Sequence, residues 1–269
     1  MIVRAIAWLM ARTPLRLAWA LAWGLAWLWW WVLPVRRAVA VSNLRACFPE
    51  LPPGPALRRM MAELILGYVE LLHHVRAPLP GLTFEGFEAL RARSQAGLGS
   101  LVLASHGGAW DLCGLATAQA TGIPTTVIAK PPASPAVAAL IRGLREGGGL
   151  ELLPPRGSMG RVMEALAEGR VVIFFLDQRH NQGVLTPFFG RDALTAPSLA
   201  IAAARAGVPV FPVWQRRIGI GAHSVRLYPP FELSGDIHRD TAAFLCFVEG
   251  RIREEAHAWL WLHDRWRRP

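Results

Sequence analysis

Cysteine is scarce in this 269-residue sequence, which contains only three of them. Cys47, Cys113 and Cys246 lie far apart and show no C-x-x-C spacing, which argues against a cysteine-ligated metal site and a disulfide framework. A sparse, odd-numbered set of this kind fits a reducing compartment. Cys113 is interpreted as a buried structural thiol, with a reactive nucleophile as the alternative.

Lysine is also nearly missing, since Lys130 is the single one and arginine carries almost all of the formal net charge of +10. The sequence has no Gly-x-Ser-x-Gly turn, which argues against a serine hydrolase. None of the common nucleic-acid-binding motifs is present either. A basic chain with 53% hydrophobic residues suits an anionic membrane surface or an acidic partner, and we expect no nucleic-acid partner.

Charge is absent between Leu17 and Val35, a stretch of 19 residues bounded by arginines. A helix of this length spans about 28 Å, just enough for a bilayer core. Tryptophan favours the membrane interface, and five tryptophans recur here at helical spacing: Trp19, Trp23, Trp27, Trp30 and Trp31. Residues 1–35 are therefore predicted to be an N-terminal membrane anchor that crosses the bilayer or lies in its interface. A helix of the protein core is the alternative.

The remaining residues, 36–269, are predicted to form one α/β domain that begins with a helical lead-in over residues 36–76. From residue 100 onward, short apolar runs alternate with helical stretches. Strands are predicted at Leu101–Ala104, Thr125–Ala129, Leu150–Leu153, Val171–Leu176, Val208–Trp214 and Ser224–Leu227. Helices are predicted at Trp110–Ala120, Pro135–Glu146, Met159–Glu168, Ala196–Ala206 and Thr241–Trp259. This alternation predicts an α/β fold with a largely parallel central sheet flanked by helices.

A histidine stands where the first of these strands ends. His106 directly follows the run Leu101–Ala104 and Ser105, and open parallel sheets place their sites at the carboxyl ends of the strands. The two glycines after it allow a sharp turn and leave room for a substrate. Asp111 lies five residues on, which is not a helical neighbour spacing, so the turn must fold back for the imidazole to meet this carboxylate.

A histidine base that is oriented by an acid is the usual arrangement for acyl transfer. We therefore expect His106 to be a general base that removes a proton from a hydroxyl acceptor, with Asp111 holding it in place. A surface histidine beside a tight glycine turn is the alternative.

These residues resemble the bacterial lipid A biosynthesis lauroyl/myristoyl acyltransferases, within the lysophospholipid acyltransferase-like superfamily. The marker of the family is a histidine, four residues and then an acid, as in His106 to Asp111. Further matches to the family occur in the expected order on both sides of this motif. They are Ser42-Asn43-Leu44 and Cys47-Phe48-Pro49 upstream, and Asp177-Gln178, Thr186-Pro187-Phe188-Phe189-Gly190, Ala193-Leu194-Thr195 and the terminal Trp259 to Trp266 downstream. The acid is Asp where the lipid A enzymes typically carry Glu, which leaves the acceptor open.

The resemblance implies an acyltransferase that moves a fatty acyl group from acyl carrier protein to a lipid or glycolipid hydroxyl, without metal or cofactor. It implies a catalytic domain on the cytoplasmic face of the bacterial inner membrane. It makes His106 the base and Asp111 its partner, and Asp177 a second acid that orients His106 or the acceptor. The substrate-binding candidates that it suggests are Trp110, Lys130, Arg145, Asp177, Gln178, Arg179, Phe188, Phe189, Gly190 and Thr195.

Several alternatives stay open at this point. The acceptor could instead be another glycolipid, an amino-acid lipid or a secondary metabolite. A lipid esterase or thioesterase would use water as the acceptor, and a non-catalytic membrane-binding protein would only share the fold. Structural roles also compete at single residues: a strand-end cap for Asp177, a solvated helix face for Arg145 and a buried aromatic turn for Phe188-Phe189-Gly190.

Overall fold

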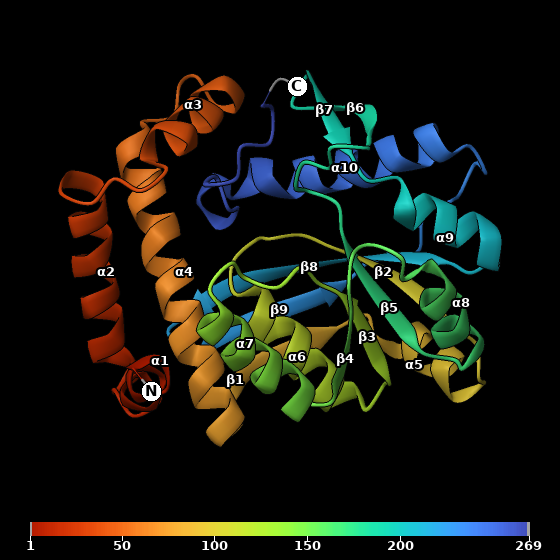
Figure 1. The fold of residues 1–269 in the computed structure, drawn as a ribbon, viewed down its shortest axis with the longest axis horizontal. Coiled ribbons are helices and arrows are strands. Elements are labelled where there is room, and N and C mark those ends of the chain that lie inside the picture. The colour runs from red at the N-terminus through yellow and green to blue at the C-terminus, as the bar shows by residue number, and fades with distance from the viewer. Residues whose placement is uncertain (1, 268–269) are drawn as a thin grey trace.

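The computed structural model describes residues 2–267 and contains an α/β sandwich with a group of helices at one side (Figure 1). These N-terminal helices are α1 (Ile2–Met10), α2 (Leu15–Trp31), α3 (Arg37–Cys47) and α4 (Pro53–Arg76). Helices α3 and α4 confirm the predicted helical lead-in. Proline is tolerated in the first turn of a helix, which is why α4 begins inside the proline-rich break. The ends of the two predicted domains, residue 1 and residues 268–269, lie outside the described residues.

A seven-stranded sheet forms the centre of the described part of the chain, in the order β1-β9-β8-β2-β5-β3-β4. Its strands are β1 (Gly81–Glu85), β2 (Ser100–Ala104), β3 (Thr125–Ile128), β4 (Leu150–Leu153), β5 (Val171–Phe175), β8 (Val210–Gly219) and β9 (Ala222–Leu227). Neighbouring strands are parallel except for the hairpin formed by β8 and β9. The predicted α/β fold with a largely parallel sheet is confirmed.

The helices of the sandwich are α5 (Glu88–Gln95), α6 (Trp110–Thr121), α7 (Pro135–Gly147), α8 (Met159–Ala167), α9 (Ser198–Ala206) and α10 (Ile237–Glu254). Four of them, α6 to α9, fall close to the predicted ranges. The prediction of a last helix reaching Trp259 was wrong, because α10 ends at Glu254. The chain then leaves the helix through an extended Glu255 and a short 3₁₀ turn, and the backbone of Trp259 pairs with Gly107. The edge strand β1, helix α5 and the hairpin of β6 (Val184–Phe188) and β7 (Arg191–Thr195) were not predicted.

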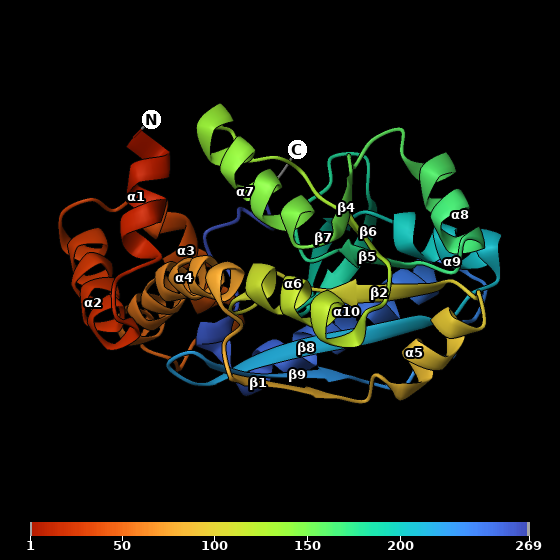
Figure 2. The same cartoon turned by 90° about the horizontal axis from the view of Figure 1, so that it is seen from below.

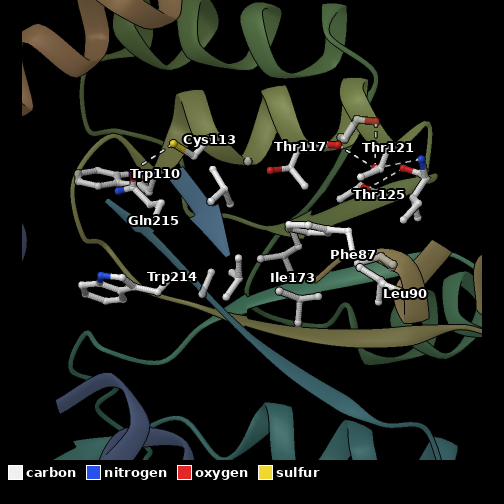
Figure 3. A pocket seen from close by; sticks show the side chains of 18 of the residues that line it. Phe87, Leu90, Trp110, Cys113, Thr117, Thr121, Thr125, Ile173, Trp214 and Gln215 are labelled. Atoms are coloured by element: carbon white, nitrogen blue, oxygen red, sulfur yellow. Dashed lines mark hydrogen bonds between the residues drawn. The ribbon is translucent and has the colours of Figure 1, made fainter. Parts of the chain in front are cut away.

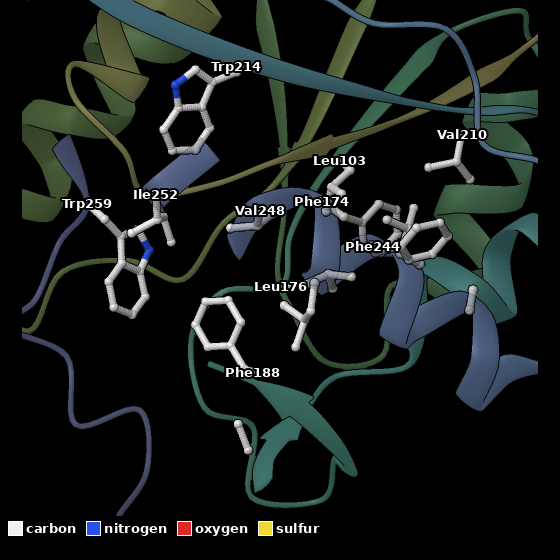
Figure 4. Packing of buried hydrophobic residues seen from close by; sticks show 14 of the residues in the cluster. Leu103, Phe174, Leu176, Phe188, Val210, Trp214, Phe244, Val248, Ile252 and Trp259 are labelled. Carbon is white, nitrogen blue, oxygen red and sulfur yellow. The ribbon is translucent and has the colours of Figure 1, made fainter. Parts of the chain in front are cut away.

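The two faces of the sheet are covered by different helices, since successive side chains of a strand point to opposite sides. Leu101 and Leu103 of β2 pack with residues of α8, α9 and α10, whereas Val102 packs with residues of α5 and α6. Figure 2 shows α6 and α10 on opposite sides of the strands. The larger core, on the α10 side, contains Phe174 and Phe244 (Figure 4). Burial on both faces explains why the neighbouring strands β2 and β5 consist almost entirely of apolar residues.

The register of two neighbouring strands determines what meets at the edge of the sheet. Strands β2 and β5 are parallel, and Ala104 lies opposite Phe175. The same register continued by two residues brings His106 level with Asp177. Both side chains therefore emerge at the carboxyl edge of the sheet, where open α/β folds place their sites.

Helix α2 lies along α4 and contacts it with a stripe of alanines. Ala18, Ala22 and Ala26 are buried in one cluster with residues of α4, whereas Leu17 and Leu21 are about half exposed. Among residues 2–267 no helix combines the length and apolarity needed to cross a bilayer; α2 itself has 17 residues. The predicted anchor is therefore not supported as a membrane-crossing segment, and its alanine face packs against protein instead.

Candidate active site

His106 and Asp177 form a double hydrogen bond at the carboxyl edge of the sheet. The ring Nδ1 of His106 lies 2.8 Å from one carboxylate oxygen of Asp177, and the His106 backbone N–H donates to the other at 2.7 Å. Asp177 is fully buried, and the His106 side chain is 22% exposed. An ionised carboxylate only accepts hydrogen bonds, so Nδ1 carries the proton and the unprotonated Nε2 is left to accept one.

Trp259 donates a third hydrogen bond to this carboxylate, from its indole N–H at 2.8 Å. The pKa of Asp177 results from opposing effects, of which burial is the largest and favours the neutral acid. The charge and hydrogen bonds of His106, together with the indole of Trp259, outweigh burial and hold the pKa of Asp177 below its usual value. Asp177 is therefore ionised at neutral pH and able to orient the imidazole.

The segment that carries Trp259 also holds the backbone of the histidine turn. The N–H of Gly108 donates to the carbonyl of Ala258 at 2.6 Å, and the N–H of Leu260 donates to the carbonyl of His106 at 3.1 Å. Gly108 adopts a φ of 55°, and a Cβ at this position would collide with the side chain of Gln215, so the turn requires glycine here. The C-terminal residues thus act on the geometry of the site although they lie far from it in sequence.

The expected contact between His106 and Asp111 is replaced by another pair. Asp111 lies in the first turn of α6, where its Oδ1 accepts from Arg145 Nε at 2.8 Å and lies 2.5 Å from an Arg145 terminal nitrogen. Asp177 makes the contact that was expected of Asp111, because the register of β2 and β5 brings it to the imidazole. Arg145 is accordingly not a solvated residue of a helix face; from the last turn of α7 it binds the first turn of α6.

Aromatic side chains enclose the imidazole. The His106 ring packs edge-on against Trp110 at 5.3 Å between centroids and lies 4.7 Å from Phe175. Tyr68 of α4 packs against the opposite part of Trp110. Burial, followed by the negative charge of Asp111, raises the pKa of Tyr68, so this phenol stays protonated. Trp110, predicted from the motif, is therefore part of the site.

An apolar cavity begins at these aromatic residues and runs between α6 and the sheet (Figure 3). The space inside it, counting the open mouth, amounts to about 680 Å³. Trp110 and Phe175, which pack on His106, line it, and Phe87 and Leu90 line its far part. The cavity presents an apolar wall directly next to the two aromatic residues that pack on the imidazole.

Three of the predicted binding residues lie at the same sheet edge without contacting His106. Lys130 is exposed after β3, and Gln178 is half-buried after Asp177. Arg179 binds locally: its backbone N–H donates to His263 Nε2 at 2.9 Å, and its side chain pairs with Asn181. Among the described residues, no group of three or more histidine, cysteine or acidic side chains is placed to hold a metal ion.

The Phe188-Phe189-Gly190 segment is a buried aromatic turn and does not line the cavity beside His106. Phe188 is fully buried and packs on Trp259 (Figure 4) and on Trp266. Phe189 and Gly190 form the tip of the β6–β7 hairpin with positive φ angles. The structural alternative for these three residues is the one that the packing supports.

Thr195 is also a core residue, since its hydroxyl accepts a hydrogen bond from the buried Arg265 at 2.6 Å. Cys113, interpreted as a structural thiol, is buried and donates to Gln215 at 3.0 Å. Burial raises the pKa of the Cys113 thiol, which disfavours the reactive thiolate.

The indole of Trp259 is the functional contact that sequence reasoning missed. From the sequence, Trp259 has no predicted role beyond its place in the terminal part of the family resemblance. Trp259 does pack on Trp261, but its N–H points to Asp177. Nothing in the spacing of the terminal motif indicates this bond, because 82 residues separate the two partners.

A profile of the bacterial lipid A biosynthesis acyltransferase family matches residues 1–268 of the chain. The chain belongs to this family. Two curated relatives are phosphatidylinositol mannoside acyltransferases. The one from Mycobacterium tuberculosis strain H37Rv is 29% identical over 189 residues, covering 67% of this chain and 58% of the relative. The one from Mycolicibacterium smegmatis is 28% identical over 179 residues, covering 64% and 58%.

The alignments thus span somewhat more than half the length of these curated relatives. The family predicted from the histidine turn, the Asp177-Gln178 pair and the terminal tryptophan motif is confirmed. In this family member the histidine of the marker motif is oriented by the acid after β5, while the acid of the motif binds an arginine.

Proposed function

We propose that this protein is a membrane-associated O-acyltransferase that moves a fatty acyl group from a thioester donor to a hydroxyl of a lipid-linked acceptor. The observation that carries the proposal is the setting of His106: Asp177 orients it through Nδ1, and it packs on Phe175, which lines an apolar cavity. Family membership and the relatives named acyltransferases support the reaction class. No metal or cofactor enters the proposed reaction.

The proposed step follows from the tautomer of His106. Its free Nε2 takes the proton of the acceptor hydroxyl while the hydroxyl oxygen attacks the thioester carbonyl. Asp177 stabilises the imidazolium that forms. The tetrahedral intermediate then collapses, the carbon–sulfur bond breaks, and the imidazolium returns the proton to the leaving thiolate. The products are an acyl ester and a free thiol, and His106 is neutral again.

The acyl chain would occupy the cavity between α6 and the sheet. Its wall is apolar, with residues such as Val102, Ile173 and Val213 facing inward. Burial of each methylene there is worth about 0.8 kcal/mol. The carbonyl carbon would then lie beside Trp110 and Phe175, within reach of His106.

The donor is inferred from the charge of the chain, and the second candidate acceptor from the names of its relatives. We propose acyl carrier protein as the donor, because an acidic carrier suits a chain with a net charge of +10. The acceptor is proposed to be a lipid A-like glycolipid. The names of the mycobacterial relatives favour a second candidate, a mannosylated phosphatidylinositol or another glycolipid.

The outer faces of the N-terminal helices suit the surface of a membrane. Leu17, Leu21 and Leu25 form an exposed stripe on α2, beside the stripe of alanines that packs on α4. The guanidinium of Arg12 stacks over the exposed Trp8 at 4.0 Å, a pairing suited to the headgroup region. We propose that α1 and α2 lie in the interface of the cytoplasmic face of the inner membrane.

The test uses the full chain, lauroyl-loaded acyl carrier protein and vesicles that contain bacterial glycolipids. The wild type should form acylated lipid, and His106→Ala should lose the product while retaining the same fold by circular dichroism and the same vesicle binding. His238→Ala, an exposed histidine on α10, serves as the matched control. Full activity of His106→Ala would contradict the proposal. Release of free fatty acid at an equal rate without lipid would identify a thioesterase instead.

A further inference from the structure

Gly114 occupies an unusual place in the wall of the cavity. It lies in the interior of α6, on the face that lines the cavity together with Trp110, Thr117 and Thr121. A Cβ built on Gly114 meets no atom within 4 Å. The open space at Gly114 therefore belongs to the cavity.

A glycine at this position costs helix stability relative to alanine. Close packing does not explain the glycine, because no neighbouring backbone or side chain lies near enough to exclude a Cβ at this position. Its backbone is helical, so no positive φ requires glycine either. The missing side chain instead leaves the cavity wider at this position.

Gly114 lies part of the way along the cavity, between its two ends. Gly114 lies four residues, about 6 Å, beyond Trp110 on α6, and Thr121 lies about 16 Å beyond Trp110. Figure 3 shows Trp110 at one end of the cavity, and Phe87 and Leu90 at the other. An acyl chain that starts beside His106 must pass Gly114 before it reaches the far half.

We infer that Gly114 determines which acyl chain lengths the protein accepts, by keeping the cavity open one helical turn from His106. Thr121 and Phe87 line the far end, where an upper limit on chain length would be set. The ligand is an alkyl chain, because the wall offers an apolar channel with few polar groups. This inference rests on the proposed acyl transfer.

The experiment compares Gly114→Ala and Gly114→Val with the wild type. Each protein receives acyl carrier protein loaded with hexanoyl, octanoyl, decanoyl, lauroyl, myristoyl or palmitoyl groups and one fixed glycolipid acceptor. In Gly114→Val, the rate ratio of long to short chains should fall roughly tenfold or more, with Gly114→Ala between it and the wild type. Gly114→Ala should melt at the wild-type temperature or above.

Two further variants locate the effect. Thr121→Leu, at the far end, should exclude only the longest chains that the wild type accepts. Gly143→Val is the matched control, because Gly143 also lies in a helix interior with open space around it, on an exposed face of α7. Its chain-length profile should equal that of the wild type.

Calorimetric binding of free fatty acids of the same lengths provides a readout that does not depend on catalysis. Loss of long-chain binding in Gly114→Val, with short-chain binding retained, supports the inference. An unchanged chain-length profile in a folded Gly114→Val protein would overturn it. If the wild type binds fatty acids in this length-dependent way but transfers none, the proposed function fails and the assignment of the cavity stands.

Discussion

Asp177 binds His106 at both its imidazole Nδ1 and its backbone N–H, at 2.8 and 2.7 Å. Two bonds to one carboxylate restrict the rotation of the ring as well as its tautomer. The neighbouring strands β2 and β5 produce this geometry directly, since their register places residues 106 and 177 side by side. The acid of the marker motif, Asp111, instead connects α6 to α7 through Arg145.

Asp177→Asn should therefore lower kcat far more than Asp111→Asn. An asparagine at 177 can hold the imidazole in the wrong tautomer and leaves the developing positive charge unstabilised. We expect kcat to fall by on the order of 10²–10⁴-fold, with KM for the donor little changed. Steady-state kinetics with acyl carrier protein as the donor carrier measure both constants.

Asp111→Asn should act mainly on stability. It weakens a charged hydrogen bond to Arg145 between two mostly buried side chains, worth about 1–3 kcal/mol. The free energy of unfolding in urea should fall accordingly. If Asp111→Asn abolished turnover while Asp177→Asn did not, the assignment of the orienting acid would be wrong.

Trp259→Phe tests the third donor to the carboxylate. Phenylalanine keeps an aromatic ring against Phe188 and Trp261 but removes the indole N–H that bonds Asp177. Loss of one hydrogen bond to a charged group should reduce kcat by about five- to fiftyfold.

A double-mutant cycle separates positioning from simple packing. In Asp177→Asn, the indole has no carboxylate to stabilise, so adding Trp259→Phe should lower kcat little further. Full additivity of the two losses would show that Trp259 acts independently of Asp177.

His263 gives a prediction for the dependence of stability on pH. Burial lowers the pKa of His263 from 6.5 to about 4, and its neutral Nε2 accepts the backbone N–H of Arg179. Between these values the unfolded chain binds more protons than the folded one, so stability rises with pH. This contribution is complete above about pH 6.5 and is lost as the pH falls through about 4.

The melting temperature measured from pH 7 to pH 4 should therefore fall more steeply for the wild type than for His263→Gln, which keeps an acceptor. Burial also lowers the pKa of His257, so part of the slope should remain in the variant. Asp177 adds to the slope only at lower pH, because the pKa of its carboxyl group is held below its usual value. Identical slopes for the two proteins would contradict the role of His263.

The two sides of α2 should respond differently to substitution. Ala22 is fully buried against α4, so Ala22→Leu should overpack the contact and cost about 1–3 kcal/mol of unfolding free energy. Leu21 is 53% exposed, so Leu21→Ser should leave the melting temperature nearly unchanged and weaken vesicle binding. Sedimentation with anionic vesicles and thermal melting measure the two effects. Equal destabilisation by both changes would rule out the two-sided helix.

Much of the fold follows from local patterns. The apolar runs at 101–104, 125–129 and 150–153 became β2, β3 and β4 almost residue for residue, because each is a short apolar run between turn residues. β1, an edge strand of the sequence Gly-Leu-Thr-Phe-Glu, carries no comparable run, and its partner β9 lies far along the chain. Likewise, the local sequence does not indicate that α10 ends before Trp259. In the structure, the backbone of Trp259 pairs with Gly107 and is not helical.

The sequence by itself determined the family, the alternation of strands and helices, and a histidine at the end of β2, because these depend on residues close together in the chain. Only the tertiary structure decided which acid orients His106, since 71 residues separate it from Asp177 and strand neighbours are not encoded in spacing. The same holds for α2. Its apolar sequence predicts a helix, but its alanine stripe is buried only because α4 packs against it. Long-range pairing decides these features because each needs a partner surface that local sequence does not contain.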